Sequence, residues 1–165
     1  MIQRIQSFLL VLALVGFVLL FLFPTATFEA KMNTNVTESS LTLFPGENNI
    51  NPETGESFMA QNSVILMIMA IVLGIGTLVS IFLYKNRVRQ MRFVSMLGLI
   101  NLVYIGLMFL ASIPDAEKAL SSMGEVSTTY SVGTFVPIIT LVLIVIAQRC
   151  IRSDEMKVRA ADRIR

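Results

Sequence analysis

Few side chains in this sequence have the type and spacing that catalysis requires. The chain has no histidine, so it lacks the usual general base near neutral pH and the commonest metal ligand. Its one cysteine, Cys150, cannot by itself form an internal disulfide, a CxxC redox pair or a thiolate zinc site. We therefore expect no enzymatic activity and no metal, haem or disulfide cofactor.

Asn101 is the most polar side chain inside an apolar block. Such a residue more often bonds a neighbouring helix than lines a transport path, and Thr77 and Thr140 are its expected partners. Small and polar residues recur at three- and four-residue steps and predict the faces through which helices pack. The expected packing residues are Asn101, Gly74, Thr77, Gly98 and Pro137. Pro137 is expected either to kink its helix or to lie in its first turn.

Four apolar blocks must position these residues. The chain has 165 residues, of which 55% are hydrophobic and 15% charged, against about 25% charged in a typical soluble domain. No Asp, Glu, Lys or Arg lies inside any block, and each is about long enough to cross a hydrocarbon core. We expect a single all-α integral membrane domain, residues 1–165, with four transmembrane helices in an up-down-up-down bundle. The expected spans are about 5–23, 63–84, 93–113 and 131–148.

Charge predicts the orientation of these spans. The amino terminus, the 85–92 loop and the 149–165 tail together carry eleven of the thirteen Lys and Arg residues. The 24–62 and 114–130 loops carry the other two. The positive-inside rule then places both termini in the cytoplasm and these two loops outside. We expect a multi-pass protein of the inner membrane.

The first outer loop and the first block each leave an alternative open. Residues 26–32 alternate apolar and polar, which predicts a strand of a small β-hairpin with residues 41–44, although a loose loop is the alternative. The first block follows a basic start and precedes small residues, as a cleaved signal peptide would. Its length and the proline that follows it favour a retained span. The tail is expected to be helical, with Ser153 as its cap.

The basic residues predict a cytoplasmic interaction surface. Eleven basic side chains exceed what orientation alone needs, and they suit contact with anionic lipid headgroups or with a membrane-protein partner. No nucleic-acid partner is expected. The acids of the tail are expected to pair with the 85–92 loop and hold the tail under the helices. The expected surface comprises Arg4, Lys85, Arg87, Arg89, Arg92, Arg152, Arg159 and Arg163.

Three short stretches resemble a known family. They are Met1 to Gln6, Tyr84 to Arg87, and Ile151 to Glu155 together with Val158 to Arg163. They resemble an uncharacterised family of small four-span membrane proteins from the Bacteroidota, catalogued as domain of unknown function 4293. The resemblance implies an inner-membrane location and a four-helix layout, and it implies no activity and no site residues.

Two functions of different classes remain. The first is a non-catalytic structural or interaction protein that acts through its basic cytoplasmic face. The alternative is a passive transporter or channel subunit that works as an oligomer. Ion-coupled carriers usually place an ionisable residue in the membrane, and none lies in these blocks, which favours the first function.

Overall fold

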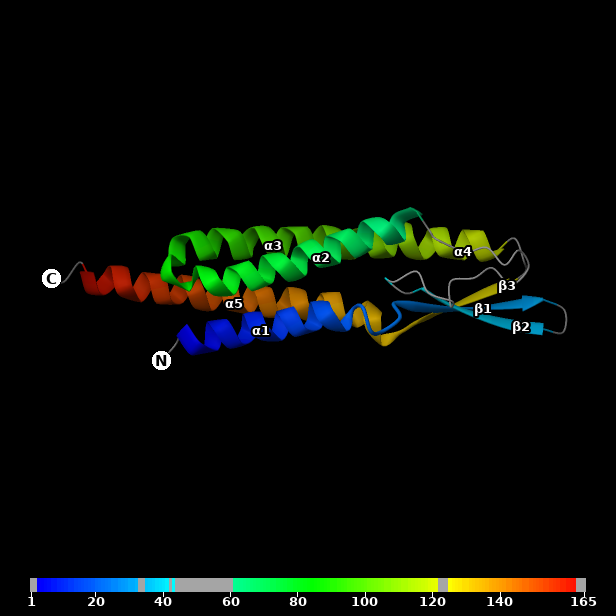
Figure 1. Ribbon diagram of the computed structural model, residues 1–165, viewed down its shortest axis with the longest axis horizontal. Coiled ribbons are helices and arrows are strands. Elements are labelled where there is room, and N and C mark those ends of the chain that lie inside the picture. Colours follow the sequence, from blue (N-terminus) through cyan, green and yellow to red (C-terminus); the bar gives the residue numbers. More distant parts are fainter. Residues whose placement is uncertain (1–2, 33–34, 42, 44–60, 122–124, 163–165) are drawn as a thin grey trace.

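The computed structural model describes residues 3–32, 35–41, 43, 61–121 and 125–162. Long helices lie side by side, and a small sheet stands at one end of them (Figure 1). The α-helices are α1 (Gln3–Leu19), α2 (Gln61–Phe82), α3 (Arg87–Leu107), α4 (Ile113–Ser121) and α5 (Val132–Asp162). The strands are β1 (Ala26–Met32), β2 (Asn35–Leu41) and β3 (Glu125–Tyr130). A 3-10 turn, Leu83–Lys85, follows α2, and a π-helical segment, Met108–Ser112, joins α3 to α4.

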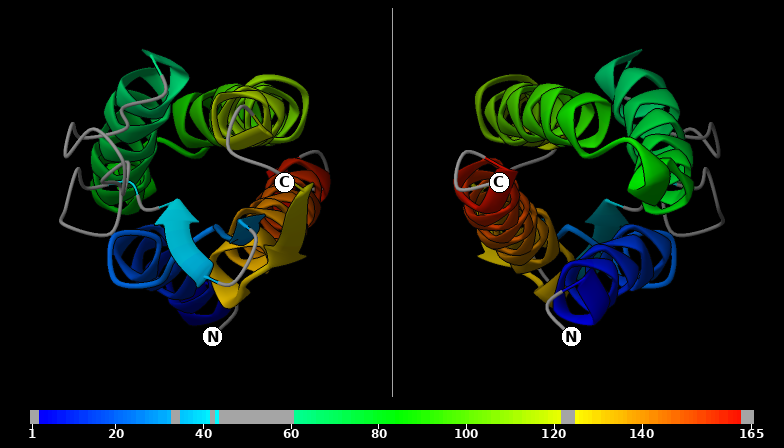
Figure 2. Two further views of the ribbon diagram at one scale, coloured as in Figure 1. Left: turned by 90° about the vertical axis from the view of Figure 1, so that its right-hand side faces the viewer. Right: turned by 90° about the vertical axis from the view of Figure 1, so that its left-hand side faces the viewer.

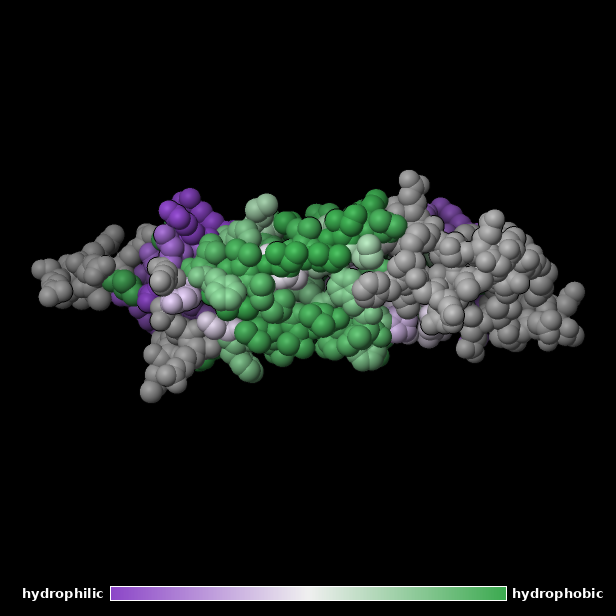
Figure 3. Space-filling model, viewed as in Figure 1, coloured by the Kyte–Doolittle hydropathy of each residue, from purple (hydrophilic) through white to green (hydrophobic). Residues whose placement is uncertain are grey.

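Among the described residues, three helices are long and apolar enough to cross a membrane. Their apolar stretches are Val64–Phe82, Arg87–Lys118 and Val132–Val158, and the apolar part of α1, Ile5–Leu19, is shorter. Many large apolar side chains on these helices face outward, and Leu110 is 83% exposed. They form a hydrophobic girdle between polar ends (Figure 3). An apolar surface of this extent requires lipid rather than water around it, so the protein is a mainly helical membrane protein.

The four long helices form a ring when viewed end-on (Figure 2). α1 and α3 each lie against α2 and α5, and successive long helices run in opposite directions. The inward side chains fill the middle of the ring, and the largest of those that are fully buried include Phe17, Leu73, Tyr104 and Met108.

The buried face of α5 is the one that the spacing of small residues predicts. The expected stripe of Gly133, Pro137, Thr140, Ile144 and Ala147 is buried throughout, and Thr134 and Val136 are buried beside it. The same stripe continues through Ile151 and Asp154, beyond the expected end of the span at residue 148. α5 is therefore one continuous helix that extends past the apolar block, and Ser153 lies inside it rather than capping a separate tail helix.

The buried face of α2 differs partly from expectation. The face combines leucines with small side chains. Its buried residues are Leu66, Ala70, Leu73, Gly76, Thr77 and Ser80. Gly74 is only half-buried, although a methyl group there would touch Phe17 of α1 at 3.9 Å. Leucine is as favourable in lipid as in the helix interior, so composition alone does not fix this rotation.

α3 begins earlier than expected, and the π-helical segment and α4 carry the helical path past the expected end at residue 113. α3 starts at Arg87, so most of the expected 85–92 loop is helical and the connection from α2 is a single tight turn. The helical path also continues past Pro114, where a stop was expected. Pro114 is the second residue of α4, where a missing backbone N–H is tolerated, and the π-helical segment precedes it. The expected outer loop 114–130 is thus largely α4 and β3.

The sheet has three strands in the order β2-β1-β3, all antiparallel. β1 coincides with the expected strand, but it pairs with β2, in the register Ala26 to Leu41, rather than with residues 41–44. β1 also pairs with β3, in the register Ala26 to Tyr130. The expected hairpin is therefore present and is extended by a strand from far along the chain. Residues 42 and 44–60 lie outside the described residues.

The entry to β1 is bonded to the start of α5. The N–H of Gly133 donates to the carbonyl of Pro24 at 3.1 Å, and the N–H of Ser131 donates to the carbonyl of Thr25 at 3.1 Å. The Thr134 hydroxyl donates to that same Thr25 carbonyl. A methyl group on Gly133 would lie under 3.0 Å from the Pro24 carbonyl oxygen, so only glycine fits here. These bonds hold the segment between α1 and β1 against the start of α5.

Candidate functional site

Basic side chains gather at the end of the helices opposite the sheet. We call this the basic end and define it by Arg87, Arg89, Arg92, Arg149 and Arg152. Arg87 is half-buried and the other four are exposed. The molecule is hydrophilic at this end, beside the apolar girdle (Figure 3). The side chains of Arg4, Lys85 and Arg159 and the whole of Arg163, also expected here, lie outside what the structure describes.

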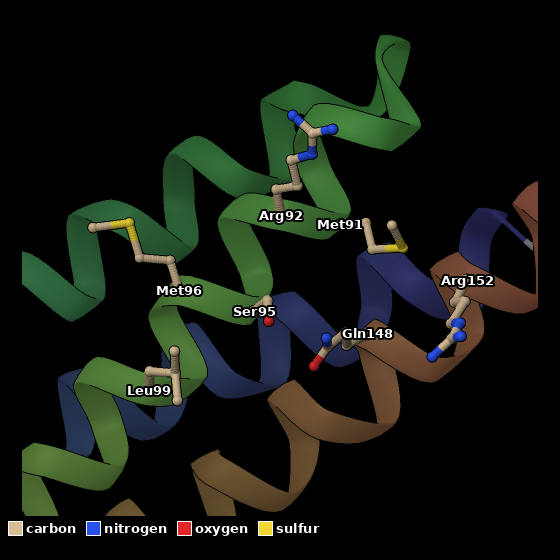
Figure 4. A pocket seen from close by; sticks show the side chains of 7 residues that line it. All are labelled: Met91, Arg92, Ser95, Met96, Leu99, Gln148 and Arg152. Atoms are coloured by element: carbon tan, nitrogen blue, oxygen red, sulfur yellow. The ribbon is translucent and has the colours of Figure 1, made fainter.

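A groove of about 460 Å³ lies at the basic end between α3 and α5. Its side chains are shown in Figure 4. It is lined by Met91, Arg92, Ser95, Met96, Leu99, Gln148 and Arg152. The α3 residues recur at helical spacing and so share one face, and Gln148 and Arg152 are four residues apart on α5. Ser95 and Gln148 lie between the two helices, with Arg92 and Arg152 to either side (Figure 4).

The groove changes from charged to apolar along α3. At 1.5 Å per residue, Leu99 lies about 10 Å deeper along the helix than Arg92. Met96 is 58% and Leu99 64% exposed, and both face outward in the apolar girdle. The groove therefore offers guanidinium groups at its polar end and an apolar floor at the other. That composition suits an amphipathic anion rather than a substrate for catalysis.

Two buried side chains fasten α1 to α5 beside the groove. The amide of Gln6 donates to the carboxylate of Asp154, and these side chains are 5% and 7% exposed. The bond joins the start of α1 to a turn of α5 beyond the apolar block. Asp154 thus lies against α1. It does not pair with the arginines between α2 and α3, as was expected. The tail continues as a projecting helix and does not fold under the bundle (Figure 1).

A third buried side chain at the basic end, Gln90, bonds α3 to α2. Its amide donates to the carbonyl of Ser80 at 3.0 Å, so it bonds the start of α3 to the last turn of α2. Gln6 and Gln90 were not predicted from the sequence, because both stand close to arginines at the edge of an apolar block and resemble surface positions. A signal was present: each lies at helical spacing from a buried residue of its own helix, Gln6 from Leu10 and Gln90 from Val94.

A polar cluster lies in the middle of the helices. Asn101 is fully buried, and its amide donates to the Thr140 hydroxyl and to the Pro137 carbonyl, each at 3.2 Å. Thr140 also donates to the Pro137 carbonyl at 2.9 Å. Of the two expected partners, Thr140 is the one brought to Asn101, because the Thr77 hydroxyl donates within α2 to Leu73 at 2.7 Å. Pro137 lies inside α5, beyond its first turn.

Three buried polar side-chain atoms on the same helical path as Asn101 have no hydrogen-bond partner among the described residues. They are the Asn101 side-chain oxygen, the Tyr104 hydroxyl and the Ser112 hydroxyl, all on buried residues of α3 or its π-helical extension. Gly98, also expected to pack, is half-buried, and a methyl group there would meet Ile144 of α5 at 3.6 Å. The cluster joins α3 to α5 by hydrogen bonds, which is a structural role for Asn101.

No group of three His, Cys, Asp or Glu side chains that could hold a metal ion occurs among the described residues. The fold and the groove together define a small helical membrane protein with a basic, amphipathic surface at one end. The chain belongs to the family described as a domain of unknown function, DUF4293, whose model matches residues 2–164. Neither a curated protein nor a solved structure matches it.

Proposed function

We propose that this protein is a non-catalytic interaction protein of the inner membrane that works through its basic end, which faces the cytoplasm. The observation that carries the proposal is the gathering of Arg87, Arg89, Arg92, Arg149 and Arg152 at the end of the helices opposite the sheet. The positive-inside rule assigns such an end to the cytoplasm. The sheet then lies outside.

The orientation requires α1 to be a fourth span. Its 17 residues extend about 25 Å, at the lower limit for crossing a hydrocarbon core of about 30 Å. Leu10, Ala13, Phe17 and Leu20 are at most 1% exposed. Cleavage of α1 as a signal peptide would remove these residues from the core. The bonds to α5 at both ends of α1 likewise support a retained span.

Passive transport by an oligomer is the second candidate. The unpartnered polar atoms of Asn101, Tyr104 and Ser112 support it, because a water path needs polar groups that are free to bond. Against a path through a single chain, the middle of the ring is filled by side chains such as Phe17 and Leu73. We therefore favour the interaction function.

The test is crosslinking in intact membranes, followed by purification of the tagged full chain in mild detergent. A protein partner should be recovered with the wild type and should fall at least several-fold with the Arg87→Gln/Arg89→Gln variant. Lys118→Gln, exposed on α4 near the sheet, is the control for loss of a positive charge and should retain the partner. The proposal would be contradicted if the arginine variant recovered as much partner as the wild type does. It would also be contradicted if only the Lys118→Gln control lost the partner.

A further inference from the structure

We propose that the groove between α3 and α5 binds the phosphate of an anionic phospholipid, with the lipid's acyl chain along its apolar floor. This inference rests on the proposed function for its side of the membrane, and it names the ligand of one part of the basic end. The groove recognises this ligand through two arginines, two neutral polar groups and three apolar side chains, all already described at the site.

Charge selects an anion. Arg92 and Arg152 come from different helices, and among the described residues those lining the groove include no carboxylate. Asp154, the nearest acid along α5 from Arg152, is buried and bonded to Gln6. The guanidinium group presents paired N–H donors that match the oxygens of a phosphate.

Neutral hydrogen-bond donors and prepositioned helical turns favour phosphate binding in addition to the two charges. The Ser95 hydroxyl and the Gln148 amide lie between the two helices, within the same groove (Figure 4). The bond between Gln6 and Asp154 fixes the turn of α5 that carries Arg152, and the bond from Gln90 to Ser80 fixes the turn of α3 that carries Arg92. Groups held before the ligand arrives lose less freedom on binding.

The apolar half of the groove selects a lipid over a soluble phosphate compound. Met96 and Leu99 continue the groove along α3 away from Arg92, and Met91 adds an apolar side chain beside the arginines (Figure 4). A free phosphate would leave this half unused, whereas an acyl chain covers it. A zwitterionic lipid would bring an ammonium group toward two arginines, so a headgroup with net negative charge is favoured.

The experiment measures lipid retention by native mass spectrometry on the purified full chain, after titration with phosphatidylglycerol or phosphatidylcholine of identical acyl chains. The wild type should retain phosphatidylglycerol in preference to phosphatidylcholine. Arg92→Gln/Arg152→Gln should weaken that binding at least about tenfold, because charge-assisted hydrogen bonds are lost. The matched control is Arg89→Gln/Arg149→Gln, which removes the same charge from exposed positions on the same two helices, outside the groove. Its binding should stay within about threefold of the wild type.

Three further results separate the alternatives. Equal losses in the two arginine variants would show diffuse attraction and overturn the site, as would equal retention of both lipids by the wild type. Competition by millimolar inorganic phosphate, at ionic strength matched with chloride, would assign the groove to a soluble phosphate compound instead. Leu99→Asn should weaken lipid binding, and unchanged binding would also contradict the lipid. Helical content and unfolding without lipid verify that each variant folds.

This test is independent of topology and of any protein partner, because it uses purified protein in detergent. Selective lipid binding with no protein partner would retain the groove and refute the wider interaction function. If a partner is lost with Arg87→Gln/Arg89→Gln but the protein shows no selective lipid binding, the interaction function is retained and the lipid site in the groove is refuted.

Discussion

Replacing Gly16 of α1 with alanine would place a methyl group against Thr140 of α5. That methyl carbon would lie under 3.0 Å from Cγ2 of Thr140, whereas carbon atoms pack best at about 3.5–4.0 Å. Thr140 cannot turn aside freely, because its hydroxyl is bonded to Pro137 and Asn101. The two helices must therefore separate by at least about 0.5 Å, or the hydrogen bonds must be lost.

The expected cost of this overpacking is about 1–3 kcal/mol. Alanine also favours the helix over glycine by up to about 1 kcal/mol, which offsets part of the cost. Gly106→Ala in α3 measures that offset alone, because a methyl group on Gly106 has nothing within 4 Å. The difference in unfolding free energy between Gly16→Ala and Gly106→Ala should thus equal the overpacking cost.

A second variant shows whether Thr140 is the obstacle. Thr140→Ser removes the Cγ2 methyl and retains the hydroxyl, so Gly16→Ala/Thr140→Ser should recover to within about 0.5 kcal/mol of Thr140→Ser alone. Unfolding would be followed by circular dichroism during titration with sodium dodecyl sulfate in mixed micelles. Equal stability of Gly16→Ala and Gly106→Ala, or no recovery in the double variant, would refute the packing of α1 on α5.

Three further predictions use the same unfolding measurement. Asn101→Ala should cost about 0.5–2 kcal/mol, because two interhelical hydrogen bonds are lost, whereas Tyr104→Phe should cost almost nothing, since its hydroxyl has no partner. A larger loss from Tyr104→Phe than from Asn101→Ala would contradict this. Gln6→Leu should cost about 1–3 kcal/mol, because it leaves the buried Asp154 without its partner. Adding Asp154→Leu should restore much of that loss. Additive losses in the double variant would refute the pairing. Gly133→Ala should be the most damaging of the glycine changes, because it clashes with a backbone carbonyl that cannot rotate away, and stability near that of the wild type would exclude that contact.

The apolar helices were predictable because lipid determines them locally. A block such as 63–84 must be helical in a membrane whatever its neighbours are, and α2, at Gln61–Phe82, agrees within two residues. The buried face of α5 was also predictable, because small and polar residues mark one stripe of it from Gly133 to Ala147. On α2 large apolar residues, mostly isoleucine, valine and leucine, lie on several faces, so the stripe was predicted only in part.

Features that depend on distant residues were not predictable in the same way. β3 owes its extended form to pairing with β1, about a hundred residues earlier, and the expected loop 114–130 therefore contained more structure than composition suggests. At the groove, Arg92 and Arg152 were expected at the basic end from charge alone. That Ser95 and Gln148 stand beside them follows from how α3 packs on α5, which a single sequence does not encode in any local pattern.

Accessibility labelling in intact cells is the most direct test of a four-span protein whose basic end faces the cytoplasm. In a Cys150→Ser background, single cysteines would replace Glu125, exposed on β3, and Lys157, exposed on α5, and a tag would precede Met1. A membrane-impermeant maleimide should label Glu125→Cys in intact cells and Lys157→Cys only after the membrane is opened. The amino-terminal tag should remain on the mature protein, and added protease should digest it only after the membrane is permeabilised. Labelling of Lys157→Cys in intact cells, or loss or early digestion of the tag, would contradict the proposed orientation and the retention of α1.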